Sequence, residues 1–145
     1  MTAEFPVAVH AMVCLWHRRC TVSSEELAGN ICTNPARVRK VMASLRRAGL
    51  AGAREGRRGG GYYVGEDAGS VTLARIYDAL GEKMVAVPWR SGDPCQECLI
   101  AAGMADAMQE VYQTMDGLCR DYLEHITVGQ MESRLVILDK ERRGA

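Results

Sequence analysis

The spacing of hydrophobic positions along this chain predicts a protein built mainly of helices. A first apolar helix is expected from about Phe5 to His17. A second, short helix begins after Ser23, which has capping-box spacing with the acidic residue three positions on, and ends near Ile31. A third begins after Asn34, whose side chain can cap it, and ends at Gly49. Two short helices joined by about three residues have the outline of a helix-turn-helix.

The third helix is amphipathic, and its two faces differ in chemistry. At about 100° per residue, one face gathers large apolar side chains, namely Val38, Val41, Met42 and Leu45. The opposite face carries small and basic residues, namely Ala36, Arg39, Lys40, Ala43 and Arg47. Small residues allow a helix to approach base edges, and arginine can bind guanine with two hydrogen bonds. The alternative interpretation is an ordinary solvated helix face.

A β-hairpin is expected directly after the third helix. Two short strands, about Leu50 to Arg54 and Tyr62 to Val64, flank a turn rich in glycine and arginine. Arg57 and Arg58 would make its tip cationic, so that it can reach phosphates or the minor groove. A nucleotide-phosphate loop is rejected, because neither Lys-Ser nor Lys-Thr follows the glycines and no helix begins there.

The second half is predicted to hold a short helix, a long loop and two more helices. The short helix covers about Leu73 to Leu80, and the loop runs from Gly81 to Glu97. A long helix from about Cys98 to Ile126 would extend roughly 44 Å, too far to pack wholly on its own domain. We therefore expect two-fold dimerisation through it, the alternative being a helix folded back on its own chain. A final helix from Val128 should close the core, with fraying from Lys140 onwards.

Composition and charge narrow the class of protein. Of the 145 residues, 48% are hydrophobic and 25% charged, values typical of a globular domain. No apolar stretch is long enough to span a bilayer, and no basic leader precedes an apolar segment, so we expect a cytoplasmic protein without membrane association. Residues 1–64 hold ten basic and four acidic residues, a charge of +6, and the neutral total leaves −6 for the rest. This division favours a polyanion-binding module, with double-stranded DNA as its partner, joined to an acidic part that does not touch the DNA.

Several segments, in one order along the chain, resemble the winged-helix regulators of the Rrf-two (Rrf2) family. They are Cys32 to Lys40, Leu45 to Leu50 and Gly59 to Tyr62, followed by Val71 to Leu73 and the region of Cys95. The Thr33-Asn34-Pro35 start and the early Ala8-Val9-His10 resemble most its YwnA-like branch. The family includes an iron–sulfur regulator, a nitric oxide sensor and a cysteine regulator. The resemblance implies a homodimeric, sequence-specific DNA-binding transcription factor, usually a repressor.

The DNA-binding residues that we predict lie on the second helix, the third helix and the wing. They are Ser23, Ser24, Thr33, Asn34, Ala36, Arg37, Arg39, Lys40, Arg47, Arg54, Arg57, Arg58, Gly60 and Tyr62. Arg39 and Lys40 are expected to contact bases or nearby phosphates, with Asn34 and Ala36 at the groove-facing helix start. The two serines, Arg47 and the two wing-tip arginines are expected to contact phosphates.

Cys95 and Cys98 form a C-x-x-C pair at the junction between the loop and the long helix. Such a pair can form a reversible disulfide, bind a soft metal or hold part of an iron–sulfur cluster, and the pair can also be structural or incidental. Cluster-binding members of the resembling family use three cysteines over a longer stretch, and some add a carboxylate from the first helix, where Pro6 aligns here. A site shared by two subunits would supply four thiolates. No cofactor is therefore assigned.

The sequence divides into three parts on this interpretation. Residues 1–66 form a winged helix-turn-helix domain, 67–97 a connecting helix and sensor loop, and 98–145 a dimerisation helix and a C-terminal helix. The predicted function is a homodimeric repressor that responds to a redox, metal or small-molecule signal at Cys95 and Cys98. The alternatives are a helical interaction adaptor without DNA affinity and a thiol oxidoreductase, for which the strand-helix-strand surroundings are missing. No catalytic motif is found, so an enzyme is not expected.

Overall fold

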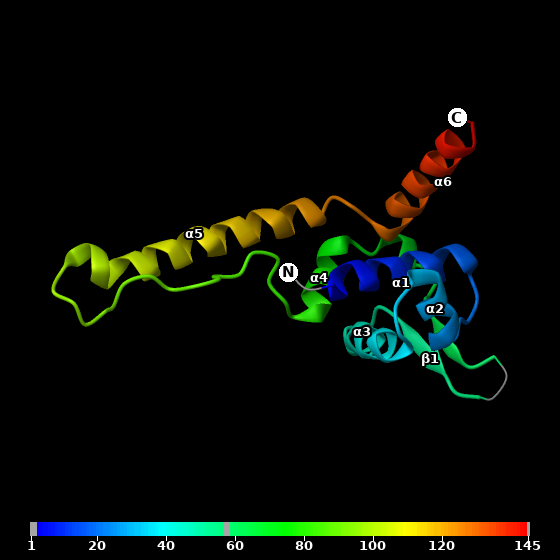
Figure 1. Ribbon diagram of the computed structural model, residues 1–145. Coiled ribbons are helices and arrows are strands. Elements are labelled where there is room, and N and C mark those ends of the chain that lie inside the picture. The colour runs from blue at the N-terminus through cyan, green and yellow to red at the C-terminus, as the bar shows by residue number, and fades with distance from the viewer. Residues whose placement is uncertain (1–2, 57–58, 145) are drawn as a thin grey trace.

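The protein is mainly helical with one small β-hairpin (Figure 1), as the sequence predicts. The computed structural model describes residues 3–56 and 59–144. Its elements are α1 (Glu4–Arg18), α2 (Ser24–Ile31), α3 (Pro35–Arg47), β1 (Gly52–Arg54), β2 (Gly61–Tyr63), a 3-10 turn η1 (Ala68–Ser70), α4 (Leu73–Leu80), α5 (Leu99–Leu123) and α6 (Val128–Gly144). The predicted starts and ends of the first four helices agree with these bounds to within about one residue.

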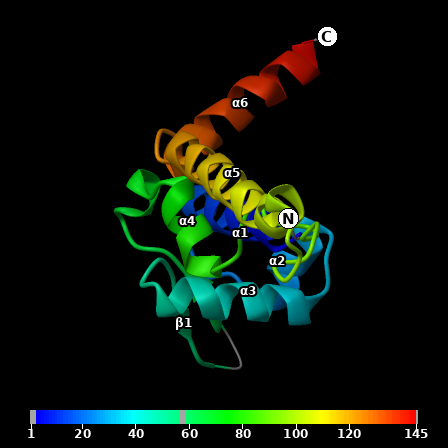
Figure 2. The same ribbon diagram turned by 90° about the vertical axis from the view of Figure 1, so that its left-hand side faces the viewer.

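Helix α1 is the centre of the core. It packs against α3, α4 and α6, and its inward residues Ala8, Ala11, Met12 and Leu15 have no exposed surface. Figure 1 shows α3 and the wing below α1 and α6 rising above it, and Figure 2, with α5 pointing toward the viewer, shows the same order. The core therefore holds α3 on one side of α1 and α6 on the other.

The wing is an antiparallel hairpin that is anchored to the start of the helix-turn-helix. β1 and β2 pair with Arg54 opposite Gly61, and Val22 exchanges two backbone hydrogen bonds, of 2.9 and 2.8 Å, with Tyr62. Gly61 has a φ of 144°, and a Cβ there would lie 2.3 Å from the carbonyl oxygen of Val22. Glycine is therefore required at this position for the close approach.

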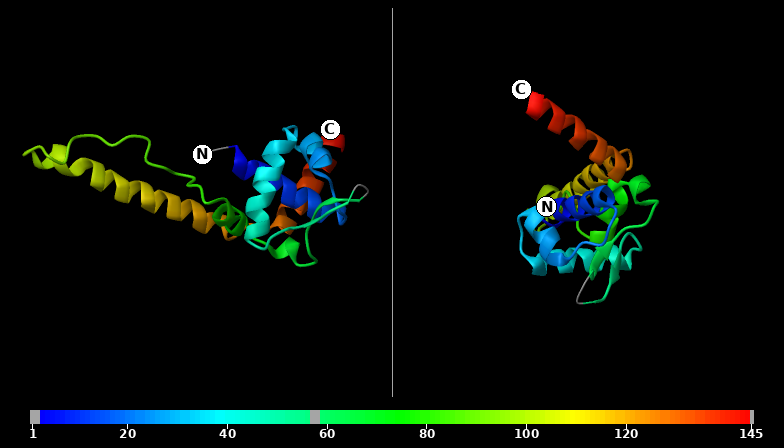
Figure 3. Two further views of the ribbon diagram at one scale, coloured as in Figure 1. Left: turned by 90° about the horizontal axis from the view of Figure 1, so that it is seen from below. Right: turned by 90° about the vertical axis from the view of Figure 1, so that its right-hand side faces the viewer.

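Helix α5 projects away from the rest of the protein, as Figures 1 and 3 show. It ends at Leu123, three residues earlier than expected, because the chain then becomes extended to pair with the segment before α4. In that pairing the N–H of Leu73 donates to the carbonyl of Ile126 at 2.8 Å, and the N–H of Val128 donates to that of Val71 at 2.9 Å. These bonds fix the base of α5 beside α4.

Helix α6 corrects two expectations. It packs on α1 and η1, but only its first residue, Val128, is buried, whereas Leu135 and its neighbours stay exposed. The final helix therefore closes the core only through its first turn, where Val128 is buried and Met131 packs against the core. It also continues through Lys140 to Gly144, where Arg143 donates to Asp139 at 2.9 Å one turn earlier. The expected fraying is not found among residues 140–144.

A buried carboxylate joins α4, the following loop and α5. Asp116 of α5, 7% exposed, accepts hydrogen bonds from the hydroxyl of Tyr77 at 2.7 and 2.8 Å and from the N–H of Val85 at 3.0 Å. The Tyr77 hydroxyl accepts in turn from the N–H of Met84 at 3.0 Å. Burial raises the pKa of Asp116, but these bonds outweigh it and leave the pKa below its ordinary value. Asp116 is therefore held ionised as a joint between three segments.

Replacing Tyr77 by phenylalanine should lower the free energy of unfolding by about 1–3 kcal/mol, because a buried carboxylate loses a donor. Urea titration at fixed protein concentration measures this. A Tyr112→Phe variant is the matched control, since the Tyr112 hydroxyl has no hydrogen bond within the described chain. An equal loss in both variants would contradict the role of the Asp116 joint.

The hydrogen bond between Tyr77 and Asp116 also predicts how the stability of the fold depends on pH. The pKa of Asp116 is lower in the folded state than in the unfolded chain, so its stabilisation is present above the unfolded pKa. That stabilisation is lost as the pH falls through the folded pKa, below about pH 4. Without the Tyr77 hydroxyl the folded pKa rises, and acid unfolding should begin at a higher pH in Tyr77→Phe than in the unmodified protein. Circular dichroism against pH measures the difference, and coincident curves would contradict it.

Candidate nucleic-acid interface

Helices α2 and α3 form the predicted helix-turn-helix, and side-chain caps fix both helix starts. The Ser23 hydroxyl accepts from the N–H of Glu26 at 3.1 Å, and the Asn34 side chain accepts from the N–H of Arg37 at 2.8 Å. Cys32 ends α2 with a φ of 63° and turns the chain toward α3. The caps satisfy N–H groups that have no partner within each helix.

The structure confirms the two faces of α3. Its apolar residues Val38, Val41, Met42 and Leu45 are buried against the core. Its outward residues are mostly exposed and basic, namely Ala36, Arg37, Arg39, Lys40, Arg46 and Arg47. In Figure 1 this helix and the wing lie on the same lower side of the molecule. The helix that carries these cations therefore lies on the same side as the wing.

Arg39 and Lys40, the residues that we expect to contact bases, are both exposed, and each lies beside an acidic residue. Arg39 lies 3.5 Å from the hydroxyl of Ser24 and 4.0 Å from a carboxylate oxygen of Glu25. The ammonium of Lys40 lies 2.7 Å from Glu4, and this contact lowers the pKa of Glu4. Exposed ion pairs are weak. A DNA phosphate can therefore compete for Arg39. Lys40 is held more firmly, because the side chain of Glu4 is only 18% exposed.

The remaining predicted DNA-binding residues are distributed over the same side. Ser24 and Thr33 are half-buried at the starts of the two helices, and Arg47 donates to Ser44 at the end of α3. In the wing, Arg54 is exposed, whereas Gly60 and the backbone-paired Tyr62 are half-buried. Arg57 and Arg58 lie outside the described residues. The side-chain oxygen of Asn34 is engaged as the helix cap, and that of Ser23 likewise, so these two oxygens already have a partner.

Two cations near this surface, the exposed Arg46 of α3 and Arg19, are absent from the predicted set. Arg19, at the end of α1, places its guanidinium carbon 3.5 Å from the centre of the Trp16 ring. The sequence signal for this contact is the spacing of three residues between Trp16 and Arg19 at the end of one helix.

Cys95 and Cys98 are both exposed at the start of α5. The backbone N–H groups of Ala101 and Ile100 lower the pKa of Cys98, as expected for a thiol at a helix N-terminus. By contrast, burial raises the pKa of Cys14 in α1. Cys98 is thus the better nucleophile of these two thiols.

The loop before Cys95 is held along α5. Arg90 donates to Asp106 at 2.7 Å and to Gln109 at 2.6 Å, and the N–H of Asp93 donates to the carbonyl of Ala101 at 2.9 Å. Within the described residues no three side chains of the metal-binding types converge on one point. A single chain therefore supplies two thiols but not the ligand set of a metal or an iron–sulfur cluster.

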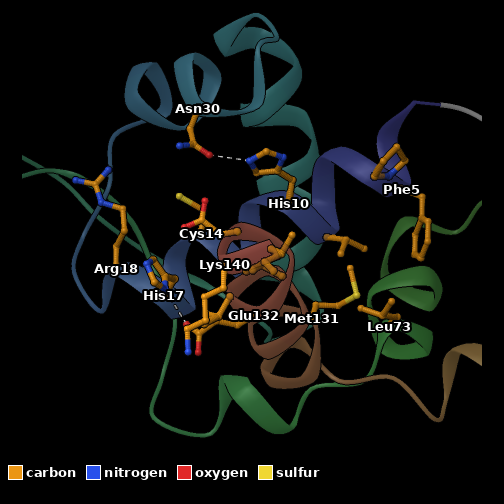
Figure 4. Close-up of a pocket in the computed structure, with 16 residues that line it drawn as sticks. Phe5, His10, Cys14, His17, Arg18, Asn30, Leu73, Met131, Glu132 and Lys140 are labelled. Atoms are coloured by element: carbon orange, nitrogen blue, oxygen red, sulfur yellow. Dashed lines mark hydrogen bonds and ion pairs between the residues drawn. The ribbon is translucent and has the colours of Figure 1, made fainter. Parts of the chain in front are cut away.

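An apolar groove of about 790 Å³ lies between α1 and α6 where the two helices pack together, on the other side of α1 from α3 (Figure 4). Both histidines of α1 at its rim have partners. His10 lies 2.7 Å from Asn30, and His17 lies 3.0 Å from Glu132. One ring nitrogen of each histidine is therefore already engaged.

Known proteins of similar sequence are transcriptional regulators. The chain is 29% identical over 107 residues to the HTH-type transcriptional regulator IscR of Klebsiella pneumoniae. That match covers 72% of this chain and 60% of the relative, so the chain spans well under two thirds of the length of this curated relative.

Solved structures show the same fold. A crystal structure from Lactobacillus plantarum, of a protein thought to be a transcriptional regulator, matches with a TM-score of 0.80 and 24% identity over 100% of both chains. CymR, the global cysteine regulator of Bacillus subtilis, matches with a TM-score of 0.66 and 17% identity, over 92% of this chain and 96% of its own. The expected winged-helix architecture is therefore confirmed.

The family comparison covers nearly the whole chain. The Rrf2 family, described as an iron-dependent transcriptional regulator, matches residues 1–134. Its members are regulators rather than enzymes, as expected. In the parts of the chain that the structure describes, no helix is both long and apolar enough to cross a membrane. The match over residues 1–134 shows that this chain belongs to the Rrf2 family of transcriptional regulators.

Proposed function

We propose that the protein is a homodimeric, sequence-specific DNA-binding repressor that acts in the cytoplasm. The observation that carries this proposal is the outward face of α3, where Arg37, Arg39 and Lys40 are exposed on the side that also holds the wing. In this proposal α3 enters the major groove, and the wing contacts the backbone or the minor groove. Family membership supports transcriptional regulation as the outcome.

The apolar surface of α5 supports dimerisation. Besides Leu99 at its start, this helix carries a stripe of seven large apolar side chains that are at least 38% exposed, namely Ile100, Met104, Met108, Val111, Met115, Leu118 and Tyr122. They recur at steps of three or four, and a stripe of this length needs a partner. A second copy related by two-fold symmetry would cover it and present two DNA-reading modules. Residues 1–66 would then read DNA, 67–97 would connect and sense, and 98–145 would supply the dimer helix and α6.

The signal that we assign to Cys95 and Cys98 is oxidation. A peroxide would take two electrons and two protons from the pair, forming one S–S bond between the thiols while the peroxide O–O bond breaks and its oxygens leave as water or alcohol. The lowered pKa of Cys98 supports this reaction. The disulfide would strain the loop that Arg90 and Asp93 hold along α5. The relative positions of the two DNA-reading modules would change, and affinity would fall.

Arg39→Ala should weaken binding to the preferred duplex by about 1–3 kcal/mol and relax base preference, because arginine is the commonest specific reader of guanine. The preferred duplex is first selected from a random DNA pool with the unmodified protein. Gel-shift titration then measures affinity for that duplex and for a scrambled one.

Arg134→Ala on α6 is the matched control for this experiment. Arg134 is an exposed arginine on the helix that lies on the other side of α1 from α3. It should leave both affinities unchanged. Unchanged affinity in Arg39→Ala would contradict the assignment of α3 to the major groove. If the affinity of the unmodified protein for DNA does not fall steeply with salt concentration, the protein is instead an interaction adaptor.

Cys98→Ser should make DNA binding insensitive to peroxide, because no disulfide with Cys95 can form. Gel shifts before and after peroxide treatment, with thiol counts on the same samples, measure this. Cys119→Ser, which removes a half-buried thiol of α5, should respond like the unmodified protein. If Cys98→Ser retains the full peroxide response, the pair is not the sensor.

A further inference from the structure

Two arginines beside the wing are each stacked on an aromatic ring that lies against a glycine. One stack consists of Arg19, Trp16 and Gly69, and the other of Arg54, Tyr63 and Gly52. The two stacks come from different parts of the chain.

The first stack ties the end of α1 to η1. A Cβ on Gly69 would lie 2.6 Å from the Trp16 ring, so only glycine lets the indole occupy this place. The guanidinium carbon of Arg19 lies 3.5 Å from the centre of the same ring. Gly69 and Arg19 therefore both lie against the indole.

The second stack lies at the base of the wing. Gly52 pairs with Tyr63 across the hairpin, and a Cβ on Gly52 would lie 2.4 Å from the Tyr63 ring. The guanidinium carbon of Arg54 lies 4.7 Å from the centre of that ring. The absence of a side chain at position 52 thus allows the tyrosine to lie across the neighbouring strand and support the arginine.

Arg19 and Arg54 both line one small hollow of about 330 Å³. Its other lining residues are Cys20, Thr21, Tyr63, Val64, Gly65 and Glu66. The backbone bonds between Val22 and Tyr62 hold these two parts of the chain together. The hollow is therefore a fixed feature at the junction of α1 and the wing.

The charge of the hollow suits an anion. Among the described residues, neither Arg19 nor Arg54 forms an ion pair or a side-chain hydrogen bond, and Glu66 is the only acidic residue in the lining. Stacking on a ring face leaves the N–H groups at the guanidinium edge available in their plane. Two such groups can bind the oxygens of one phosphate, and stacking reduces the side-chain entropy lost on binding.

We propose that Arg19 and Arg54 form a phosphate-binding site that grips the DNA backbone at the base of the wing. This inference rests on the proposed function and extends the DNA contact surface to the end of α1. The two arginines position the wing through one phosphate and read no base.

Single variants Arg19→Gln and Arg54→Gln test the site in the full chain. Each should weaken binding to the selected duplex and to a scrambled duplex by the same factor, about tenfold, the size of one charged hydrogen bond. Each should also reduce the slope of log affinity against log salt by about one. Gel-shift titrations at several salt concentrations measure both quantities.

Two further variants separate geometry from charge. Arg134→Gln removes the same charge far from the wing and should change neither the affinity nor the slope. Arg54→Lys keeps the charge but loses the planar fork, so it should restore the slope but only part of the affinity. Circular dichroism confirms that each variant is folded before its titration is interpreted.

Free phosphate is the competing source of the anion. Thermal unfolding of the unmodified protein in inorganic phosphate and in chloride, at equal ionic strength, tests it. A phosphate stabilisation that is lost in both glutamine variants, together with unchanged DNA binding, would assign the site to a free phosphate compound and overturn the DNA contact.

The remaining outcomes separate this inference from the proposed function. If the unmodified protein binds DNA with a steep salt slope that both glutamine variants retain, the phosphate grip is wrong and the repressor stands. If the affinity of the unmodified protein for DNA shows no steep salt dependence, both the phosphate-binding site and the proposed repressor function are wrong.

Discussion

The burial of one face of α3 against α1 is the constraint on which the rest of the structure depends. Four α3 residues, Val38, Val41, Met42 and Leu45, enter the same core as Met12 and Leu15. Each large apolar side chain gains roughly 1.5–3 kcal/mol from burial, which outweighs any weak ion pair on the surface. Burial of the apolar face therefore fixes the rotation of α3 about its own axis. As a result, its arginines and its lysine face the solvent.

The same packing connects the outward face of α3 to distant parts of the chain. α4 packs against α3 and, through the Tyr77 hydroxyl, against the buried carboxylate of Asp116 in α5. Asp116 also accepts from the backbone N–H of Val85, within the loop that leads to Cys95. In the proposed mechanism, a change in that loop would reach α3 through these packed elements and this buried hydrogen-bond network.

Local physics made much of the fold predictable, and non-local contacts account for the rest. Caps at Ser23 and Asn34, and the apolar period of α1 and α3, act within a few residues, so they are visible in the sequence. The Asp116 joint depends on residues 39 and 31 positions away. For the same reason the periodicity of α5 does not reveal where it ends, since pairing with residues 71–73 ends it. In the candidate site, the cations of α3 were predictable. The spacing of Trp16 and Arg19 indicates their contact but not its place beside the wing, which depends on where Gly69 and the hairpin lie.

The basic surface of α3 and the wing and the apolar stripe of α5 lie on separate parts of the protein. The cations of α3 and the wing make contacts that are individually weak, whereas the exposed stripe of α5 is apolar and projects from the winged domain. In the proposed dimer, pairing of the stripes makes the second DNA contact intramolecular, which raises affinity without any new contact. This gain in affinity is lost when the two DNA-reading modules of the dimer cannot bind both half-sites of the DNA at once. A signal near Cys95 and Cys98 then needs to alter only the separation of the modules, not the chemistry of either one.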